Sequence, residues 1–144
     1  MSDISASLVK ELREKTGLGL MDCKKALEEV DGNIELAVEE LRKSSGLKAS
    51  KKSTRSAADG LIGVKRNGNE SYMLEINCET DFVARDDSFI KFVEEVLNEF
   101  SKNPKKSLEE LLLEGIEESR QKLVQKLGEN IVVRRLAKSI EEAD

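Results

Sequence analysis

Residues 80–84, which read Thr-Asp-Phe-Val-Ala, place a carboxylate beside an aromatic ring where a strand pattern gives way to a helix pattern. Residues 72–79 alternate apolar and polar side chains, which is typical of a half-buried strand. A helix is predicted to begin only after residues 86–88. The short connection between the two elements is expected to run over the surface, where rigid neighbours can hold a projecting group in a fixed pose. Asp81 and Phe82 are therefore the leading candidates for a functional site.

Five carboxylates occur close together in this part of the chain: Glu75, Glu79, Asp81, Asp86 and Asp87. Their spacing fits neither an acid–base pair nor a metal site, so a small Asp/Glu hydrolase is the least favoured interpretation. Glu75 and Glu79 are expected on the solvent face of the strand. Asp86 and Asp87 suit the positive end of the following helix, where each would contribute about half a kcal/mol. Asp81 alone is left without a structural role.

Phe82 also fits a purely structural interpretation, in which the helix begins earlier. It would then share one helical stripe with Phe89, Val93 and Val96, and its ring would be ordinary core. The period of the sequence leaves both interpretations open. The capping pattern of residues 86–88 favours a break before Phe89, which would let the ring project.

Composition and charge argue against several functions. The chain has 144 residues, of which 38% are hydrophobic and 37% charged, enough for one compact domain or two small ones. The net charge of −5 comes from intermixed acidic and basic residues and only 3% are aromatic, so direct nucleic-acid binding is not expected. No apolar run approaches the roughly 18 residues that cross a bilayer, so no membrane association is predicted. The first residues do not resemble a secretory or transit signal, and a cytoplasmic location is expected.

Histidine is absent, which removes histidine-based acid–base catalysis, nucleophile pairs and imidazole metal ligands. Cys23 and Cys78 lie far apart without a Cys-x-x-Cys pattern, so two reduced, buried thiols are expected. Gly17-Leu18-Gly19 lacks the Gly-Lys-Ser of a phosphate-binding loop and is interpreted as a connection between helices. The sequence therefore predicts no enzyme, no cofactor and no metal site.

The hydrophobic pattern predicts an α+β protein in three parts. Residues 1–45 carry three short helical patterns and are expected to form a compact bundle, of a size that usually serves as a docking module. The apolar positions of the second helix are Leu20, Met21, Cys23, Ala26 and Leu27. Residues 46–59 are basic and lack an apolar period, which indicates a flexible or loosely helical tether. The alternative for this segment is contact with an acidic patch on a partner.

Residues 60–144 are predicted to form a core subdomain, a small antiparallel three-stranded sheet packed with helices. The predicted elements are, in order, strands over 61–66 and 70–79, helices over 89–100, 107–113 and 116–127, and a strand over 130–136. Asn67-Gly68 suits a tight hairpin turn between the first two strands. The helix over 89–100 is strongly amphipathic and can lie across one face of the hairpin.

Four stretches of the chain match a known family. They are Leu8-Val9-Lys10-Glu11-Leu12-Arg13 continuing through Lys15-Thr16-Gly17 and Met21-Asp22-Cys23-Lys24-Lys25-Ala26-Leu27 to Leu41-Arg42, Ala58-Asp59-Gly60, Glu75-Ile76-Asn77-Cys78-Glu79-Thr80-Asp81-Phe82-Val83-Ala84, and Gly128-Glu129-Asn130-Ile131. Together these stretches span nearly the whole chain. They resemble the elongation factor Ts family, the guanine nucleotide exchange factors of the translation GTPase elongation factor Tu.

The resemblance implies that residues 1–45 form a module similar to a ubiquitin-associated (UBA-like) domain that docks on the GTPase. It also implies that Thr80, Asp81, Phe82 and Val83 push against the GTPase near its nucleotide and dislodge Mg²⁺. Mg²⁺ bridges the β-phosphate and protein oxygens in such GTPases, so its displacement removes the largest local positive charge that holds GDP. No bond is made or broken, and the factor needs no catalytic group of its own.

The sequence also departs from the family. Longer members carry a second core subdomain, a helical hairpin insertion and a C-terminal helical module, whereas this sequence ends at Asp144. It is interpreted either as a naturally short member or as a longer protein cut after the first core subdomain. A second copy could cover the sheet edge that is left open, so homodimerisation is one expectation. The alternative function is a non-exchanging interaction or stabilising subunit that binds elongation factor Tu or another partner through the bundle.

Overall fold

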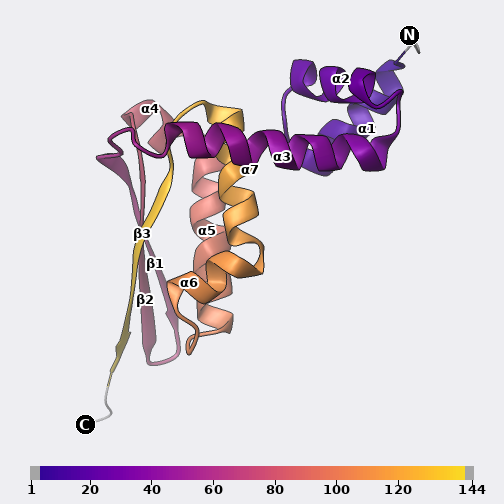
Figure 1. Cartoon of the computed structure of the whole chain (residues 1–144). Coiled ribbons are helices and arrows are strands. Elements are labelled where there is room, and N and C mark those ends of the chain that lie inside the picture. Colours follow the sequence, from indigo (N-terminus) through magenta and orange to yellow (C-terminus); the bar gives the residue numbers. More distant parts are fainter. Residues whose placement is uncertain (1–3, 142–144) are drawn as a thin grey trace.

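The computed structural model describes residues 4–141 and has two parts, which one long helix joins (Figure 1). The first part is a bundle of three helices, α1 (Ala6–Thr16), α2 (Leu20–Glu29) and α3 (Ile34–Lys52). The second part is a three-stranded sheet with helices against one face. The far half of α3 belongs to this second part, where it packs against helix α7 (Glu117–Leu127).

Local hydrogen bonds set the limits of the bundle helices. The side chain of Ser5 caps α1 by accepting a hydrogen bond from the backbone N–H of Leu8, and Asn33 caps α3 in the same way. Gly17 ends α1 in the left-handed conformation, with φ of 71°, which costs glycine little. The helices bury a separate apolar core, made by Val9, Leu12, Leu18, Cys23, Ala26, Leu27, Ala37 and Leu41.

The third helix differs from the sequence prediction, which placed a tether from residue 46 onward. Helix α3 instead continues to Lys52, because Ser45 and Ala49 are buried in its second half. The hydroxyl of Ser45 donates to the side-chain oxygen of Gln125 on α7, and Lys52 Nζ donates to the carbonyl of Gly128 at 2.9 Å. The short segment 53–58 alone connects α3 to the first strand. The division into a docking module, a tether and a core remains a prediction.

The sheet confirms the predicted α+β class. Its strands β1 (Asp59–Asn67), β2 (Glu70–Cys78) and β3 (Val132–Ile140) are antiparallel and lie in the order β1-β2-β3. The predicted tight hairpin is present, but its centre is shifted by one residue: Asn67 pairs with Glu70, so Gly68 and Asn69 form the two-residue loop, and Gly68 supplies the positive φ, 65°. Strand β3 extends to Ile140, further than the predicted residues 130–136.

Helices cover one face of the sheet, and the opposite face is open (Figure 1). After β2 the chain forms α4 (Asp81–Ala84), α5 (Asp87–Lys102), α6 (Leu108–Leu111), a π-helical turn η1 (Leu112–Ile116) and α7. Tyr72 and Phe100 meet edge to face with ring centroids 5.3 Å apart, which joins β2 to the end of α5. The core between these layers is completed by Leu74, Ile76, Phe89, Phe92, Val96, Val124 and Ile131. Among residues 4–141, no helix combines the length and apolar character needed to cross a bilayer.

Candidate functional site

The predicted site lies at the top of the sheet, where β2 ends (Figure 1). The connection predicted there contains one turn of helix, α4, which begins at Asp81. Thr80 caps this turn, since its Oγ1 accepts a hydrogen bond from the backbone N–H of Val83 at 3.4 Å. Asp86 then caps α5, because its Oδ1 accepts from the N–H of Ser88 at 2.8 Å. The chain therefore breaks between α4 and α5, as the capping pattern predicted.

Phe82 projects from this turn into solvent. Its side chain is 81% exposed, whereas Phe89, which begins the apolar stripe of α5, is fully buried. The interpretation of Phe82 as ordinary core is therefore wrong, because the break before α5 rotates it off that stripe. Val83 is half-buried against the core, and Ala84 is buried. The turn thus holds two apolar side chains inside and presents one outside.

Asp81 is exposed beside Phe82. Its carboxylate lies 3.5 Å from the guanidinium of Arg85, and both side chains are more than half exposed. An ion pair of this kind in water contributes about 0 to 1 kcal/mol, so it leaves the carboxylate accessible to another charged group. The segment therefore presents a negative charge and an aromatic ring together.

The sequence did not reveal which residue holds Thr80. The carboxylate of Glu129, in the turn after α7, accepts hydrogen bonds from the backbone N–H groups of Glu79 and Thr80 at 3.1 and 3.0 Å. It also accepts from the hydroxyl of Thr80 at 2.8 Å. Glu129 follows Thr80 by 49 residues, and no local pattern connects positions so far apart.

The bundle presents apolar side chains that the sequence placed in its interior. The predicted stripe of α2 is correct for Cys23, Ala26 and Leu27, which are buried. It is wrong for Leu20 and Met21, which lie on the first turn of α2 and are 54% and 74% exposed, outside the apolar core of the bundle. Exposed neighbouring apolar side chains are a feature of contact surfaces.

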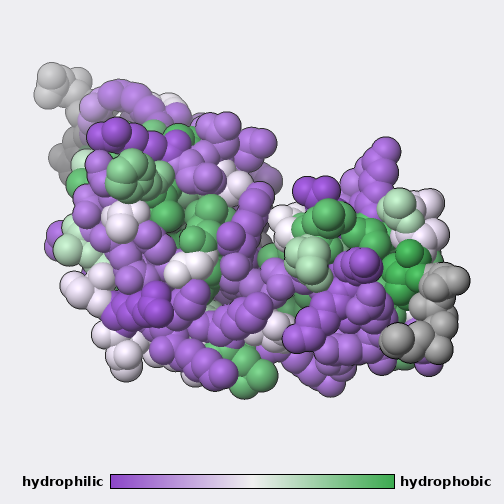
Figure 2. Space-filling view, turned by 90° about the horizontal axis from the view of Figure 1, so that it is seen from above, coloured by the Kyte–Doolittle hydropathy of each residue, from purple (hydrophilic) through white to green (hydrophobic). Residues whose placement is uncertain are grey.

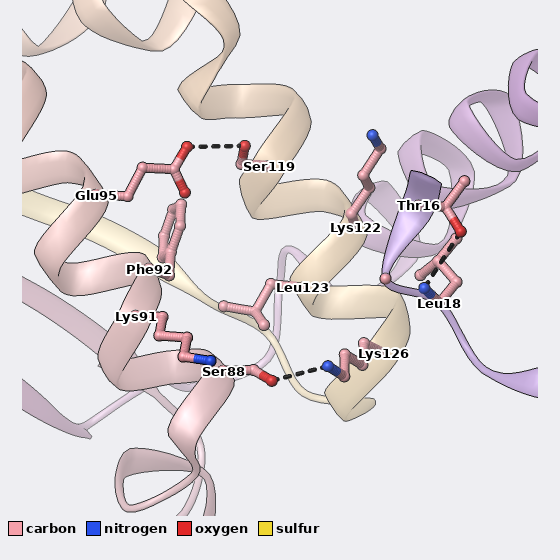
Figure 3. A pocket seen from close by; sticks show the side chains of 11 residues that line it. Thr16, Leu18, Ser88, Lys91, Phe92, Glu95, Ser119, Lys122, Leu123 and Lys126 are labelled. Atoms are coloured by element: carbon pink, nitrogen blue, oxygen red, sulfur yellow. Dashed lines mark hydrogen bonds between the residues drawn. The ribbon is translucent and has the colours of Figure 1, made fainter. Parts of the chain in front are cut away.

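A cleft of about 400 Å³ lies between the bundle and helices α5 and α7 (Figure 3). Its lining combines apolar side chains, among them Phe92 and Leu123, with the lysines Lys91, Lys122 and Lys126. Lys126 Nζ donates to Ser88 Oγ at 2.8 Å, and Ser119 donates to Glu95 at 3.2 Å, so both contacts link α5 to α7. Seen from above, the surface is mainly hydrophilic, with hydrophobic patches on both parts of the molecule (Figure 2).

The carboxylates near the site take different positions. Glu75 pairs with Arg135 at 2.7 Å on the open face of the sheet, as predicted. Glu79 departs from the prediction, because its half-buried carboxylate turns inward and accepts from the backbone N–H of Asn130 at 2.6 Å. In the described part of the chain, residues 4–141, no three His, Cys, Asp or Glu side chains are placed to hold a metal ion.

Both cysteines are buried thiols, as expected. Cys78 Sγ donates to the backbone oxygen of Thr80 at 3.2 Å. Burial, reinforced by the negative charge of Glu129, raises the pKa of Cys78 to about 11. The pKa of Cys23 is also raised, mainly because its thiol is buried. Neither cysteine therefore has the lowered pKa that marks a nucleophilic thiol.

The fold and the site together define a class: an α+β protein that presents exposed apolar side chains from a helical bundle and from a capped turn. Comparison with known proteins gives the family. The family model described as "Elongation factor TS" matches residues 79–144, which include the turn that carries Phe82.

Curated relatives match the chain over almost all of its length. It is 54% identical over 140 residues to elongation factor Ts of Marinobacter nauticus, which covers 96% of this chain and 48% of that protein. The elongation factor Ts proteins of Hahella chejuensis and Klebsiella pneumoniae are 56% and 55% identical over 137 residues, covering 94% and 95% of this chain and 48% of each relative. The chain belongs to the elongation factor Ts family, and it spans about half the length of the curated relatives it matches.

Proposed function

We propose that this chain is a guanine nucleotide exchange factor that binds the GDP form of elongation factor Tu and promotes GDP release in translation elongation, in the cytoplasm. Thr80, Asp81, Phe82 and Val83 form the segment that disturbs the Mg²⁺ site of the GTPase. Family membership supports the activity. The observation that carries the assignment of the segment is the 81% exposure of the Phe82 ring on a turn that the core anchors.

The proposed effect on the Mg²⁺ site draws on the free energy gained when the Phe82 ring is buried against the partner. Burying a phenylalanine side chain that is exposed in the unbound protein contributes about 2 kcal/mol. Because the turn is rigid, burial of the ring would displace the partner residues that hold the cation and would leave the turn in place. Asp81 brings a negative charge toward the same place, where it would compete with the anionic ligands of Mg²⁺. Once the cation moves, the diphosphate loses its largest counter-charge, and GDP leaves faster.

Thermodynamic linkage adds a constraint on the cycle. If the chain weakens nucleotide binding by some factor, bound nucleotide weakens the binding of the chain by the same factor. Arrival of GTP with Mg²⁺ therefore displaces the factor, which can act again. No covalent step is needed, and so the chain works without a catalytic group of its own.

The test is stopped-flow release of fluorescent GDP from elongation factor Tu with and without the chain. Phe82→Ala should slow the stimulated release at least about tenfold, since it removes most of the energy of ring burial. Its thermal stability should stay within the error of the unchanged protein, because the ring is exposed. Leu113→Ala is the matched control, since Leu113 is 88% exposed but lies in the η1 turn. Equal rates for the Phe82 variant and the unchanged chain would remove Phe82 from the mechanism.

A second candidate function is a non-exchanging interaction or stabilising subunit that binds elongation factor Tu or another partner through the bundle. The exposure of Leu20 and Met21 favours it, because these side chains could serve as a docking surface without any contribution from Phe82. The same experiment separates the two functions. Binding to the GDP complex without faster GDP release would support the interaction subunit.

Homodimerisation also remains a proposal, and the exposed side chains favour the open face of the sheet over the open edge that the sequence suggested. The open face of the sheet exposes Ile62, Val64 and Met73, with exposed fractions of 64%, 63% and 49%. Neighbouring apolar side chains on one face suit a second apolar sheet. Light scattering should then give the mass of a dimer, and Met73→Lys should give the mass of a monomer. A monomer mass for the unchanged chain at working concentration would reject the proposal.

A further inference from the structure

We propose that Glu129, in the turn after α7, is a positioning residue that fixes the pose of the Phe82 turn through direct hydrogen bonds to the end of β2. The proposal rests on the exchange function above, since it concerns how the segment is presented to the GTPase. It also makes a claim about the isolated chain: that residues 79–83 keep their conformation because of the Glu129 carboxylate.

The carboxylate of Glu129 makes three hydrogen bonds at the end of β2. Its Oε1 accepts from the backbone N–H groups of Glu79 and Thr80, and its Oε2 accepts from Thr80 Oγ1. These two N–H groups stand where the strand ladder has ended, since β2 stops at Cys78. A carboxylate that accepts several N–H and O–H bonds makes stronger contacts than a neutral acceptor would. Glu129 thus accepts hydrogen bonds from two backbone N–H groups that have no partner in the strand ladder.

The bond to the Thr80 hydroxyl extends this control to the helical turn. Thr80 Oγ1 donates its only proton to Glu129, so its lone pairs are left to accept from the N–H of Val83 at 3.4 Å. The orientation of the cap of α4 is therefore set by Glu129. Phe82 lies inside the turn that this cap closes, and its direction follows from it.

A reciprocal contact locks the two segments together. While Glu129 binds the backbone after β2, the Glu79 carboxylate binds the backbone N–H of Asn130 at 2.6 Å. Asn130 in turn is almost fully buried, and its side-chain amide donates to the carbonyl of Arg55 at 2.8 Å. The guanidinium of Arg55 lies 3.6 Å from the Glu79 carboxylate. The segment after α3, the end of β2 and the turn before β3 are thereby joined in one network.

This arrangement explains how the four-residue helix α4 can keep its conformation when Phe82 contacts a partner. A helix of one turn is not stable alone, because nucleation is unfavourable. Val83 and Ala84 anchor α4 only on its inner side. Glu129 supplies the restraint on the side of β2, and without it the turn could rotate away when Phe82 meets the partner.

The first experiment uses the isolated chain. With 4-fluorophenylalanine in place of all four phenylalanines, the Phe82 resonance is identified by Phe82→Leu, and the other three rings are buried. Glu129→Ala should shift and broaden the Phe82 resonance and speed hydrogen exchange at the Val83 amide, while the buried rings keep their signals. Glu129→Gln should keep most of the original Phe82 signal and Val83 protection, because its amide oxygen can still accept from Glu79 and Thr80.

The second experiment measures GDP release as a function of chain concentration. Glu129→Ala should lower the maximal stimulated rate about tenfold, as expected when the side chain that contacts the partner is misplaced by roughly 1 Å or less. The concentration that gives half of this rate should change little, because the bundle and Phe82 remain available for binding. Glu129→Gln should recover most of the rate. Glu99→Ala, which removes an exposed carboxylate that pairs with Lys102, is the control and should match the unchanged chain.

The two experiments fail in distinguishable ways. Unchanged fluorine and hydrogen-exchange signals in Glu129→Ala would overturn the positioning role, whatever the exchange activity. Changed signals with an unchanged maximal rate would likewise overturn it, since the pose would not matter for function. If the unchanged chain does not accelerate GDP release at all, the proposed function fails, while the first experiment still decides whether Glu129 fixes the turn.

Discussion

Cys78 lies three residues before α4, and its pKa reflects the burial and the negative charge at the end of β2. Its thiol is buried and donates to the Thr80 carbonyl, and its pKa is raised from the ordinary 9.0 to about 11 by burial and, to a smaller extent, by Glu129. The folded protein therefore holds this proton more tightly than the unfolded chain does. By linkage, the contribution of Cys78 to stability is complete below pH 9 and is lost as the pH rises through about 11.

This predicts a specific loss of stability in alkaline solution. Between pH 9 and about pH 11 the free energy of unfolding, measured with urea, should fall more steeply for the unchanged chain than for Cys78→Ala. The difference between the two curves isolates Cys78 from Tyr72, whose pKa is also raised, mainly by its hydrogen bond to Glu70. Parallel curves would show that the thiol has the same pKa in the folded and unfolded states.

At the residue scale, the exposure of Phe82 was predictable because a local capping pattern decided it. Asp86 caps α5, and this local pattern was enough to predict that Phe82 lies outside the apolar stripe of that helix. Leu20 and Met21 have the same spacing as buried residues, and nothing local distinguishes them from the core. The role of Glu129 depends on its contact with Thr80, which is 49 residues away in the sequence. No periodic pattern in a single sequence predicts such a contact.

Gly60 is the most constrained position in the strands. It has φ of 143°, and an added Cβ would lie 2.1 Å from the carbonyl oxygen of Ile76 on the neighbouring strand. Gly60→Ala should therefore lower the free energy of unfolding by about 3 kcal/mol, through backbone strain and overlap with atoms that cannot move aside.

Gly68 provides the comparison for this prediction. It also has positive φ, 65°, but an added Cβ would meet no atom within 4 Å. Gly68→Ala should cost about 1 kcal/mol, the strain term alone. Urea denaturation of both variants measures the two values, and equal losses would mean that the close approach to β2 has no energetic effect.

At the element scale, β2 and α5 were predicted well because each carries its own period, whereas the predicted end of β3 was four residues too early. Alternation in residues 72–79 and the stripe of residues 89–100 depend on neighbours in the sequence. Helix α3 was cut short in the prediction, because Gly46 and the lysines after it show no apolar period. What keeps these residues helical is packing against α7, including the bond from Ser45 to Gln125, 80 residues away. Tertiary contact thus overrode local preference.

At the scale of the molecule, exposed apolar side chains occur on both parts, among them Leu20 and Met21 on the bundle and Phe82 on the second part. If the bundle docks on the partner, Met21→Glu should raise the concentration of chain needed for half-maximal GDP release about tenfold, since burying a methionine contributes roughly 1.5 kcal/mol. The maximal rate should change little, because Phe82 is untouched. Folding should be unaffected within about 0.5 kcal/mol, since Met21 is 74% exposed.

Leu113→Glu is the matched control for this prediction, because it places the same charge on an exposed apolar position in the η1 turn. It should leave both the half-maximal concentration and the maximal rate unchanged. An equal effect of the two glutamates would indicate a general charge repulsion, and no effect of Met21→Glu would remove the bundle from docking.

The continuity of α3 has one more consequence. Its 19 residues make a rod of about 28 Å, with one end inside the bundle and the other fixed by Lys52 and the contacts with α7. The helix therefore connects the part of the molecule that carries Met21 to the part that carries Phe82. If one partner contacts both side chains at once, the spacing of its two receptive sites becomes part of the recognition, and a partner with a different spacing would engage only one of them.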